Sequence, residues 1–184
     1  MKIISLFALA VMAVSIGARA QTTDPVQKAL LAAPNEAAAK DATVIKWKPD
    51  QTYDTLKQGT SRLVCYDLSG MPLERPFSTE CTSVANLPRV AQNRKLAAMA
   101  GGDEKKMEEL IQAAGKDGSR VKAEVGSVFY NFRGADEATA TRHTTVAMPG
   151  FRGNQVGLPE TRDQGGAWLM FAGTSEAHIM VPGR

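Results

Sequence analysis

The spacing of apolar residues changes from a helix period to a strand period near residue 121 of this 184-residue chain, and that change constrains the fold more than any other feature. Up to residue 114 the clearest pattern repeats at i, i+3, i+4 and i+7, the spacing of one helix face: Met107, Leu110, Ile111 and Ala114. From residue 121 onward apolar and polar positions alternate, which is the period of a half-buried strand. Helices followed by strands are typical of an α+β fold, so we expect a mainly antiparallel sheet with helices packed on one face.

Capping signals place the helices. Asp24 and Pro25 begin a short helix that continues to Leu31, since an acid at the N-cap and a proline at the first position favour helix initiation. Apolar spacing predicts a second helix over 86–100. Asp103 caps the helix that follows it, and Gly115 stands where a glycine commonly ends a helix.

Strands are predicted where β-branched and aromatic residues cluster or alternate, namely at 43–47, 62–66, 121–125, 128–132, 142–148, 167–172 and 177–181. The apolar face changes parity near Gly126, which predicts a β-bulge there. A two- or four-residue connection within 173–176 would join the last two strands as a hairpin. That register sets Phe171 opposite His178 and Leu169 opposite Met180.

The first twenty residues have the pattern of a secretion signal. Lys2 precedes an apolar run over 3–16, and Ala18-Arg19-Ala20 supplies small residues at both recognition positions of a cleavage site. A membrane anchor is the alternative, but the run is short of the about 20 apolar residues that a bilayer requires. We therefore expect a signal peptide over 1–20 and one exported domain over 21–184, periplasmic or extracellular, with no stable membrane insertion after cleavage.

Cys65 and Cys81 are the only cysteines, and 15 residues separate them. Two thiols in an oxidising compartment usually form a disulfide. Closing a loop of this size stabilises a fold by about 3 kcal/mol in the chain-entropy description. Because Gly70, Pro72 and Pro76 fall between the cysteines, we expect little regular structure there.

The charge balance argues against polyanionic partners. The whole chain has 22 Lys and Arg against 19 Asp and Glu. Removing Lys2 and Arg19 with the leader leaves a net charge of +1. A nearly neutral domain has no long-range field to attract nucleic acid, so we expect none as a partner.

The segment 149–166 is the first candidate for ligand binding, because it is a long glycine-rich stretch between predicted strands and such loops are often functional. Arg152 and Arg162 are suited to an anionic group, and Glu160 and Asp163 to proton transfer. A solvated loop with internal ion pairs is the alternative. The glycines lack the spacing of a phosphate-binding loop, so a nucleotide site is not expected.

The disulfide loop is a second exposed candidate. Its possible contact residues are Met71, Leu73 and Phe77. These side chains would equally suit packing against the core.

His178 and Met180 would share one side of a strand, and nitrogen and sulfur ligands suit copper in an exported protein. The register given above turns Met170 to the opposite face, which leaves two ligands. A histidine packed in the core is therefore the competing interpretation of His178.

A hydrolase is the enzymatic alternative, with acid and base drawn from Glu160, Asp163, His143 or His178. The stretch Gly173 to Ala177 superficially resembles a nucleophile elbow, but it precedes a predicted strand instead of a helix. A hairpin turn is the better interpretation of that stretch.

The C-terminal pattern is similar to that of an uncharacterised family of exported bacterial proteins. The resemblance lies in Trp168-Leu169-Met170, in 178–182 (His-Ile-Met-Val-Pro), and in Thr60 five residues before Cys65. It implies export from a bacterium and carries no assigned activity or catalytic residue.

Together these features predict an exported binding or accessory protein that acts on a small molecule or a protein partner. A small secreted hydrolase and a copper-binding protein are the alternatives. Arg152, Glu160, Arg162, Asp163 and His178 are the expected ligand contacts, and no cofactor is expected.

Overall fold

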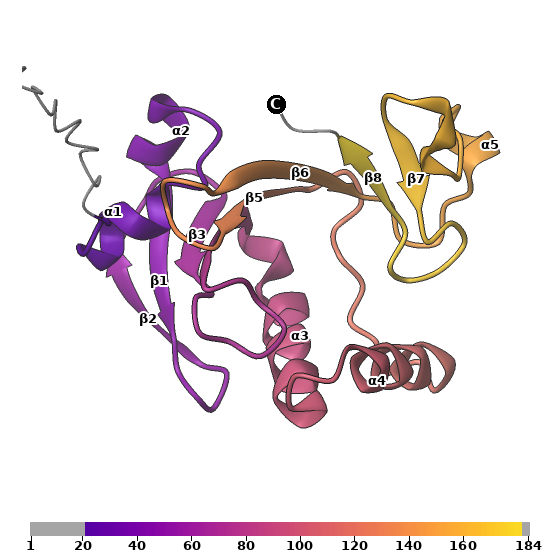
Figure 1. Cartoon of the computed structure of the whole chain (residues 1–184), viewed down its shortest axis with the longest axis horizontal. Helices are drawn as coiled ribbons and strands as arrows, with labels where there is room; N and C mark the ends of the chain where they lie inside the picture. The colour runs from indigo at the N-terminus through magenta and orange to yellow at the C-terminus, as the bar shows by residue number, and fades with distance from the viewer. Residues whose placement is uncertain (1–20, 182–184) are drawn as a thin grey trace, which may run out of the picture.

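A computed structural model describes residues 21–181 of the chain (Figure 1). The leader expected over 1–20 lies outside the described residues. The helices are α1 (Pro25–Leu30), α2 (Glu36–Asp41), α3 (Leu87–Ala100), α4 (Glu104–Lys116) and α5 (Gly153–Val156), with 3-10 turns at Val84–Asn86 and Arg162–Gln164. The strands are β1 (Thr43–Trp47), β2 (Tyr53–Lys57), β3 (Leu63–Asp67), β4 (Phe77–Ser83), β5 (Val128–Gly134), β6 (Thr141–Ala147), β7 (Trp168–Met170) and β8 (His178–Val181).

Within the described residues the strands form one eight-stranded sheet in the order β2-β1-β3-β4-β5-β6-β8-β7. Only β1 and β3 run parallel; the other neighbouring pairs are antiparallel. The expected α+β class and the mainly antiparallel sheet are confirmed. Strands β2 and β4 were not expected from the sequence.

The helices divide between the two faces of the sheet, whereas the sequence predicted them on one face. Strand β3 is buried on both sides, because Val64 and Tyr66 point to one face and Cys65 to the other. Helix α1 covers the face of Cys65, and Leu87 and Val90 of α3 pack on the face of Tyr66. A strand whose successive residues are all apolar needs cover on both faces, which explains why helices lie on both.

The predicted disulfide is present. Cys65 and Cys81 are directly opposite each other on β3 and β4, with an S–S distance of 2.07 Å, and both are fully buried. The bond fixes the register of the two central strands. Residues 68–76 between them are irregular, as expected, but β4 begins at Phe77 within the segment that was expected to lack structure.

The strand and β-bulge predicted over 121–127 are wrong. This segment is irregular, and Gly126 forms a turn with a φ of 77°. Its first backbone N–H groups donate to side chains: Gln92 accepts from Val121 N at 2.9 Å, and Asn86 accepts from Glu124 N at 2.8 Å. Only its end reaches the sheet, where Gly126 N donates to Ala147 O at 2.8 Å. Apolar alternation alone does not reveal such side-chain partners.

Helix α4 has the predicted N-cap, where Asp103 accepts from Lys106 N at 3.0 Å. Its C-terminus lies two residues later than a cap at Gly115 would give, because Gly115 remains helical and the helix ends at Lys116. The left-handed residue that follows is Gly118, with a φ of 78°.

The predicted register of the last two strands is also wrong. Met170 lies opposite His178, and Leu169 lies opposite Ile179. The connection over 171–177 is longer than a tight hairpin because it bonds to the segment before α5: Gly173 N donates to Phe151 O at 2.7 Å, and Gly150 N donates to Thr174 O at 2.7 Å. Contacts distant in sequence thus decide this register.

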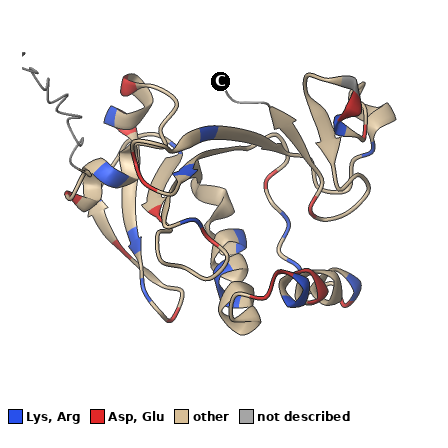
Figure 2. Ribbon diagram, in the orientation of Figure 1, with Lys and Arg blue, Asp and Glu red and all other residues tan. Residues whose placement is uncertain are grey.

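Acidic and basic positions are distributed over both helices and strands, and α4 carries both signs (Figure 2). Among residues 21–181, no helix combines the length and the apolar character needed to cross a bilayer.

Candidate functional site

A row of polar and aromatic side chains crosses four neighbouring strands at one level of the sheet. Tyr66 on β3 lies opposite Glu80 on β4, Glu80 lies opposite Asn131 on β5, and Asn131 lies opposite His143 on β6. Directly opposed residues in a sheet point to the same face. The row therefore brings a phenol, a carboxyl, an amide and an imidazole onto one surface.

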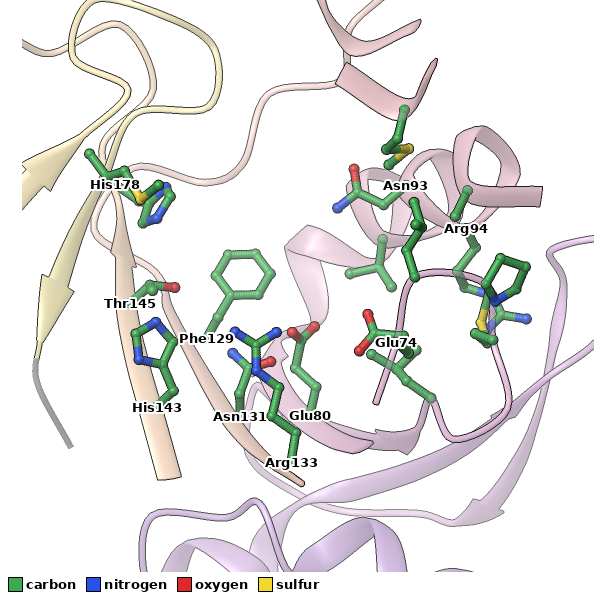
Figure 3. Close-up of a pocket in the computed structure, with 18 of the residues that line it drawn as sticks. Glu74, Glu80, Asn93, Arg94, Phe129, Asn131, Arg133, His143, Thr145 and His178 are labelled. Atoms are coloured by element: carbon green, nitrogen blue, oxygen red, sulfur yellow. The ribbon is translucent and has the colours of Figure 1, made fainter. Parts of the chain in front are cut away.

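This surface forms the floor of a cleft of about 510 Å³ (Figure 3). Small-molecule sites usually enclose about 300–1,000 Å³. One wall is the inner side of α3 with Val90, Asn93 and Arg94, and another is the irregular segment 68–74. The third wall comes from β8 and the end of β7. Apolar side chains in the lining are Met71, Leu73, Val90, Phe129, Met170, Phe171 and Met180.

Glu80 is the titratable group at the centre of the floor. Burial raises its pKa to about 7, although a hydrogen bond from Tyr66 lowers it; the charge of Glu74 raises it and that of Arg133 lowers it. Tyr66 Oη donates to Glu80 Oε1 at 2.5 Å. Burial, together with the charge of Glu80, raises the pKa of Tyr66 well above 10, so this phenol keeps its proton at neutral pH. The pair holds a carboxyl that gains or loses a proton near neutrality.

Cationic and neutral donors surround Glu80. Arg133 stands two residues from Asn131 on β5, and Figure 3 shows its guanidinium beside the Glu80 carboxyl. Arg133 is solvent-exposed. The pKa of His143 is lowered by burial first, then by the charge of Arg133, and further when His178 is protonated, so its imidazole is neutral at pH 7. Arg94 of α3 also lines the cleft, but its Nε donates to Gln51 Oε1 at 2.9 Å and its guanidinium lies 5.1 Å from the centre of the Trp47 ring.

His178 lines the far end of the same cleft. Its Nδ1 lies 2.7 Å from the carbonyl oxygen of Glu176, and its Nε2 lies 3.1 Å from Met180 Sδ. The ring of Phe171 lies 5.8 Å from the His178 ring. Because Met170 is opposite His178, it shares the face of both His178 and Met180, contrary to the register expected from the sequence.

A buried ion network holds the end of the loop that leads into β8 and His178. Glu176 accepts from Arg89 at 2.5 Å and from Arg120 at 2.8 Å and 3.0 Å. Burial alone would raise the pKa of Glu176, but the hydrogen bond from Arg120 and the charges of Arg89 and Arg120 outweigh it and lower the pKa. The two arginines come from α3 and from the segment after α4, so the network ties three parts of the chain together.

Of the five ligand contacts expected from the sequence, only His178 lines this cleft. Arg152, Glu160, Arg162 and Asp163 are exposed and lie outside it. Glu160 accepts from Gly153 N at 2.7 Å, and Arg162 lies over the Trp168 ring at 5.7 Å.

The residues considered for the disulfide loop divide between two places. Met71 and Leu73 line the cleft. Phe77 is fully buried on the other face of the sheet, against Phe132.

The histidines named for a hydrolase, His143 and His178, both line the cleft, whereas Glu160 and Asp163 do not join them. Two carboxyl groups, Glu74 and Glu80, line the cleft with them, and sequence reasoning missed both; Glu80 is the one on the strands of the floor. A signal for it existed, because pairing Cys65 with Cys81 in antiparallel strands sets Tyr66 opposite Glu80.

Comparison of the chain with models of known protein families, with curated proteins and with solved structures finds no match in any of the three.

Proposed function

We propose that this protein is an exported binding protein that holds a small amphipathic carboxylate in the cleft between the sheet and α3. The apparent signal peptide and the disulfide support export. The observation that carries the proposal is the position of Glu80, a carboxyl with a pKa of about 7, beside Arg133 in the floor of an apolar-walled cleft.

The floor is suited to a carboxylate headgroup. Arg133 supplies a permanent positive charge and Asn131 an amide donor. Below about pH 7 Glu80 is protonated and offers an O–H donor; above that pH it carries a negative charge that repels an anion. The apolar side chains of Met71, Val90 and Phe129 surround the space above and would contact the ligand's hydrocarbon part.

Binding of octanoate tests the proposal, with octanamide as the uncharged probe of the same shape. We expect octanoate to bind more tightly, and Arg133→Gln to remove that difference. Arg142→Gln is the matched control, because Arg142 lies on the neighbouring strand opposite Phe132 and its guanidinium covers that ring on the other face of the sheet. Equal affinity of octanoate for wild type, Arg133→Gln and Arg142→Gln would contradict the proposal.

The pH dependence gives a second arm. Between pH 6.5 and 8.5 octanoate stays ionised while Glu80 loses its proton, so the affinity should fall by up to about tenfold per pH unit above pH 7. Glu80→Gln keeps a neutral donor at every pH and should give a flat profile. A wild-type slope that persists in Glu80→Gln would assign the effect to another group.

A hydrolase remains the second candidate, because a carboxyl with a pKa near 7 in a cleft is suited to general acid–base catalysis. p-Nitrophenyl octanoate separates the two functions. An enzyme would release p-nitrophenol in many turnovers and lose this in Glu80→Gln, whereas a binding protein would leave the ester intact.

A further inference from the structure

The contact between His178 and Met180 joins two atoms that are both hydrogen-bond acceptors. The Glu176 carbonyl can only accept a hydrogen bond, so the 2.7 Å contact with His178 Nδ1 places the ring proton on Nδ1. In this neutral tautomer Nε2 carries a lone pair. The Met180 thioether has no proton, and its Sδ lies 3.1 Å from Nε2. Two lone pairs therefore face each other inside the cleft.

A cation between these two atoms would turn the contact into a favourable one. Hydrogen bonding of Nδ1 to a carbonyl is also the usual way in which proteins orient a histidine whose Nε2 binds a metal. Here the carbonyl belongs to Glu176, whose side chain is held by Arg89 and Arg120. The residue that orients His178 is thus itself held by an ion pair with each of two buried arginines.

Met170 supplies a third donor on the same surface. It lies directly opposite His178 across the β7–β8 pair, where Cβ atoms are about 4.5–5.5 Å apart. Met170, His178 and Met180 are each half-buried and line one end of the cleft. Phe171 and Trp168 flank them: Phe171 next to Met170 in the chain, and Trp168 opposite Met180.

We propose that Met170, His178 and Met180 form a binding site for a soft monovalent metal ion of the Cu(I) class. One imidazole nitrogen and two thioether sulfurs are soft, uncharged ligands, which suit Cu(I) far better than a hard divalent ion. Within residues 21–181 no cluster of three His, Cys, Asp or Glu side chains offers a harder metal a site. This site goes beyond carboxylate binding, because it uses none of the groups around Glu80.

Silver(I) is the probe of choice, because it has the ligand preferences of Cu(I) and needs no reductant that would open the Cys65–Cys81 bond. The experiment titrates silver nitrate, in chloride-free buffer, into protein carrying ¹³C-methyl methionine. We expect one equivalent to shift the methyl signals of Met170 and Met180. The signal of Met99, which is exposed on α3, should not move.

The Ag(I) affinities of conservative variants give a second test of the proposal. Met170→Leu, Met180→Leu and His178→Gln should each weaken Ag(I) binding at least about tenfold, since even loss of an outer-shell partner costs 10- to 100-fold at metal sites. Met99→Leu should bind like wild type. Unchanged methyl signals at Met170 and Met180 in the folded wild-type protein would overturn the proposal, as would equal affinity in all four variants. If the silver-free protein carries the ring proton of His178 on Nε2, the contact with Met180 Sδ is a hydrogen bond, and the proposal is overturned.

The outcome does not depend on the carboxylate proposal. Arg133→Gln removes a group used only for octanoate, so it should leave the silver affinity unchanged. If octanoate does not bind but silver does, the metal-site proposal stands and the carboxylate proposal fails. If octanoate binds but silver does not, only the metal-site proposal fails.

Discussion

Replacing Glu176 with glutamine should be among the most destabilising single changes in this protein. The side chains of Arg89 and Arg120 are only 7% and 2% exposed, and Glu176 is the carboxylate that both contact. Glutamine has nearly the same shape but no charge, so the variant would leave two guanidinium groups buried without a counter-ion. Removing one partner of a buried ion pair costs about 3–5 kcal/mol.

The lower end of that range applies here, because Glu176 itself remains 23% exposed and water can reach it. We therefore expect Glu176→Gln to lower the free energy of unfolding by about 3 kcal/mol. For a domain of this size that corresponds to a fall in Tm of about 6–12 °C. Urea unfolding followed by circular dichroism, with the disulfide intact, measures the difference directly.

Asp54→Asn is the matched control. Asp54 pairs with Lys48 at 2.6 Å on the surface, where the two side chains are 60% and 44% exposed, and solvent screening leaves such exposed pairs with little effect on stability. The pH dependence of the free energy of unfolding gives a second test, because the direction of its change can be predicted. Because the pKa of Glu176 is lowered in the folded state, its contribution is present above the ordinary carboxyl range and disappears as pH falls through the lowered pKa. A cost for Glu176→Gln no larger than that of Asp54→Asn would refute the reasoning.

Two further changes test the floor of the cleft and the bond beneath it. Tyr66→Phe removes a hydrogen bond that lowers the pKa of Glu80, so that pKa should rise above about 7, as measured by ¹³C NMR of the carboxyl. An unchanged or lower pKa would show that this hydrogen bond does not stabilise the carboxylate. The double variant Cys65→Ala with Cys81→Ala should lose about 3 kcal/mol of stability, and a denaturation midpoint like that of wild type would mean that the bond does not restrict the unfolded chain.

Local signals predicted the elements that depend on local chemistry. The caps at Asp24 and Asp103 act within three residues of themselves, and both are observed to accept hydrogen bonds from the first turn. The cysteine pair was predictable because only one pairing exists. The strand predicted over 121–125 failed because Asn86 and Gln92 of distant segments take its backbone bonds, and no local pattern records such a partner.

The candidate site divides in the same way. His178 and Met180 were visible in the sequence because two residues on one strand share a face. Met170 was placed on the wrong face, since the loop 171–177 bonds to residues 150 and 151 and shifts the register by one. Glu80 was missed because its neighbours in space, Tyr66, Asn131 and Arg133, come from other strands.

The two ends of the cleft are therefore held by different interactions, a disulfide and an ion network. At one end the disulfide sets Tyr66 opposite Glu80, so the position of the titratable carboxyl follows from a covalent bond in the centre of the sheet. At the other end the loop before β8 is held by Glu176 with its two arginines, and the orientation of His178 follows from electrostatics. Reduction breaks the disulfide but leaves the ion network, which contains no cysteine. Acid protonates Glu176 and weakens the ion network but leaves the disulfide. Reduction should therefore weaken octanoate binding first and acid should weaken silver binding first, although Arg89 joins the Glu176 network to α3, which also forms a wall of the octanoate site.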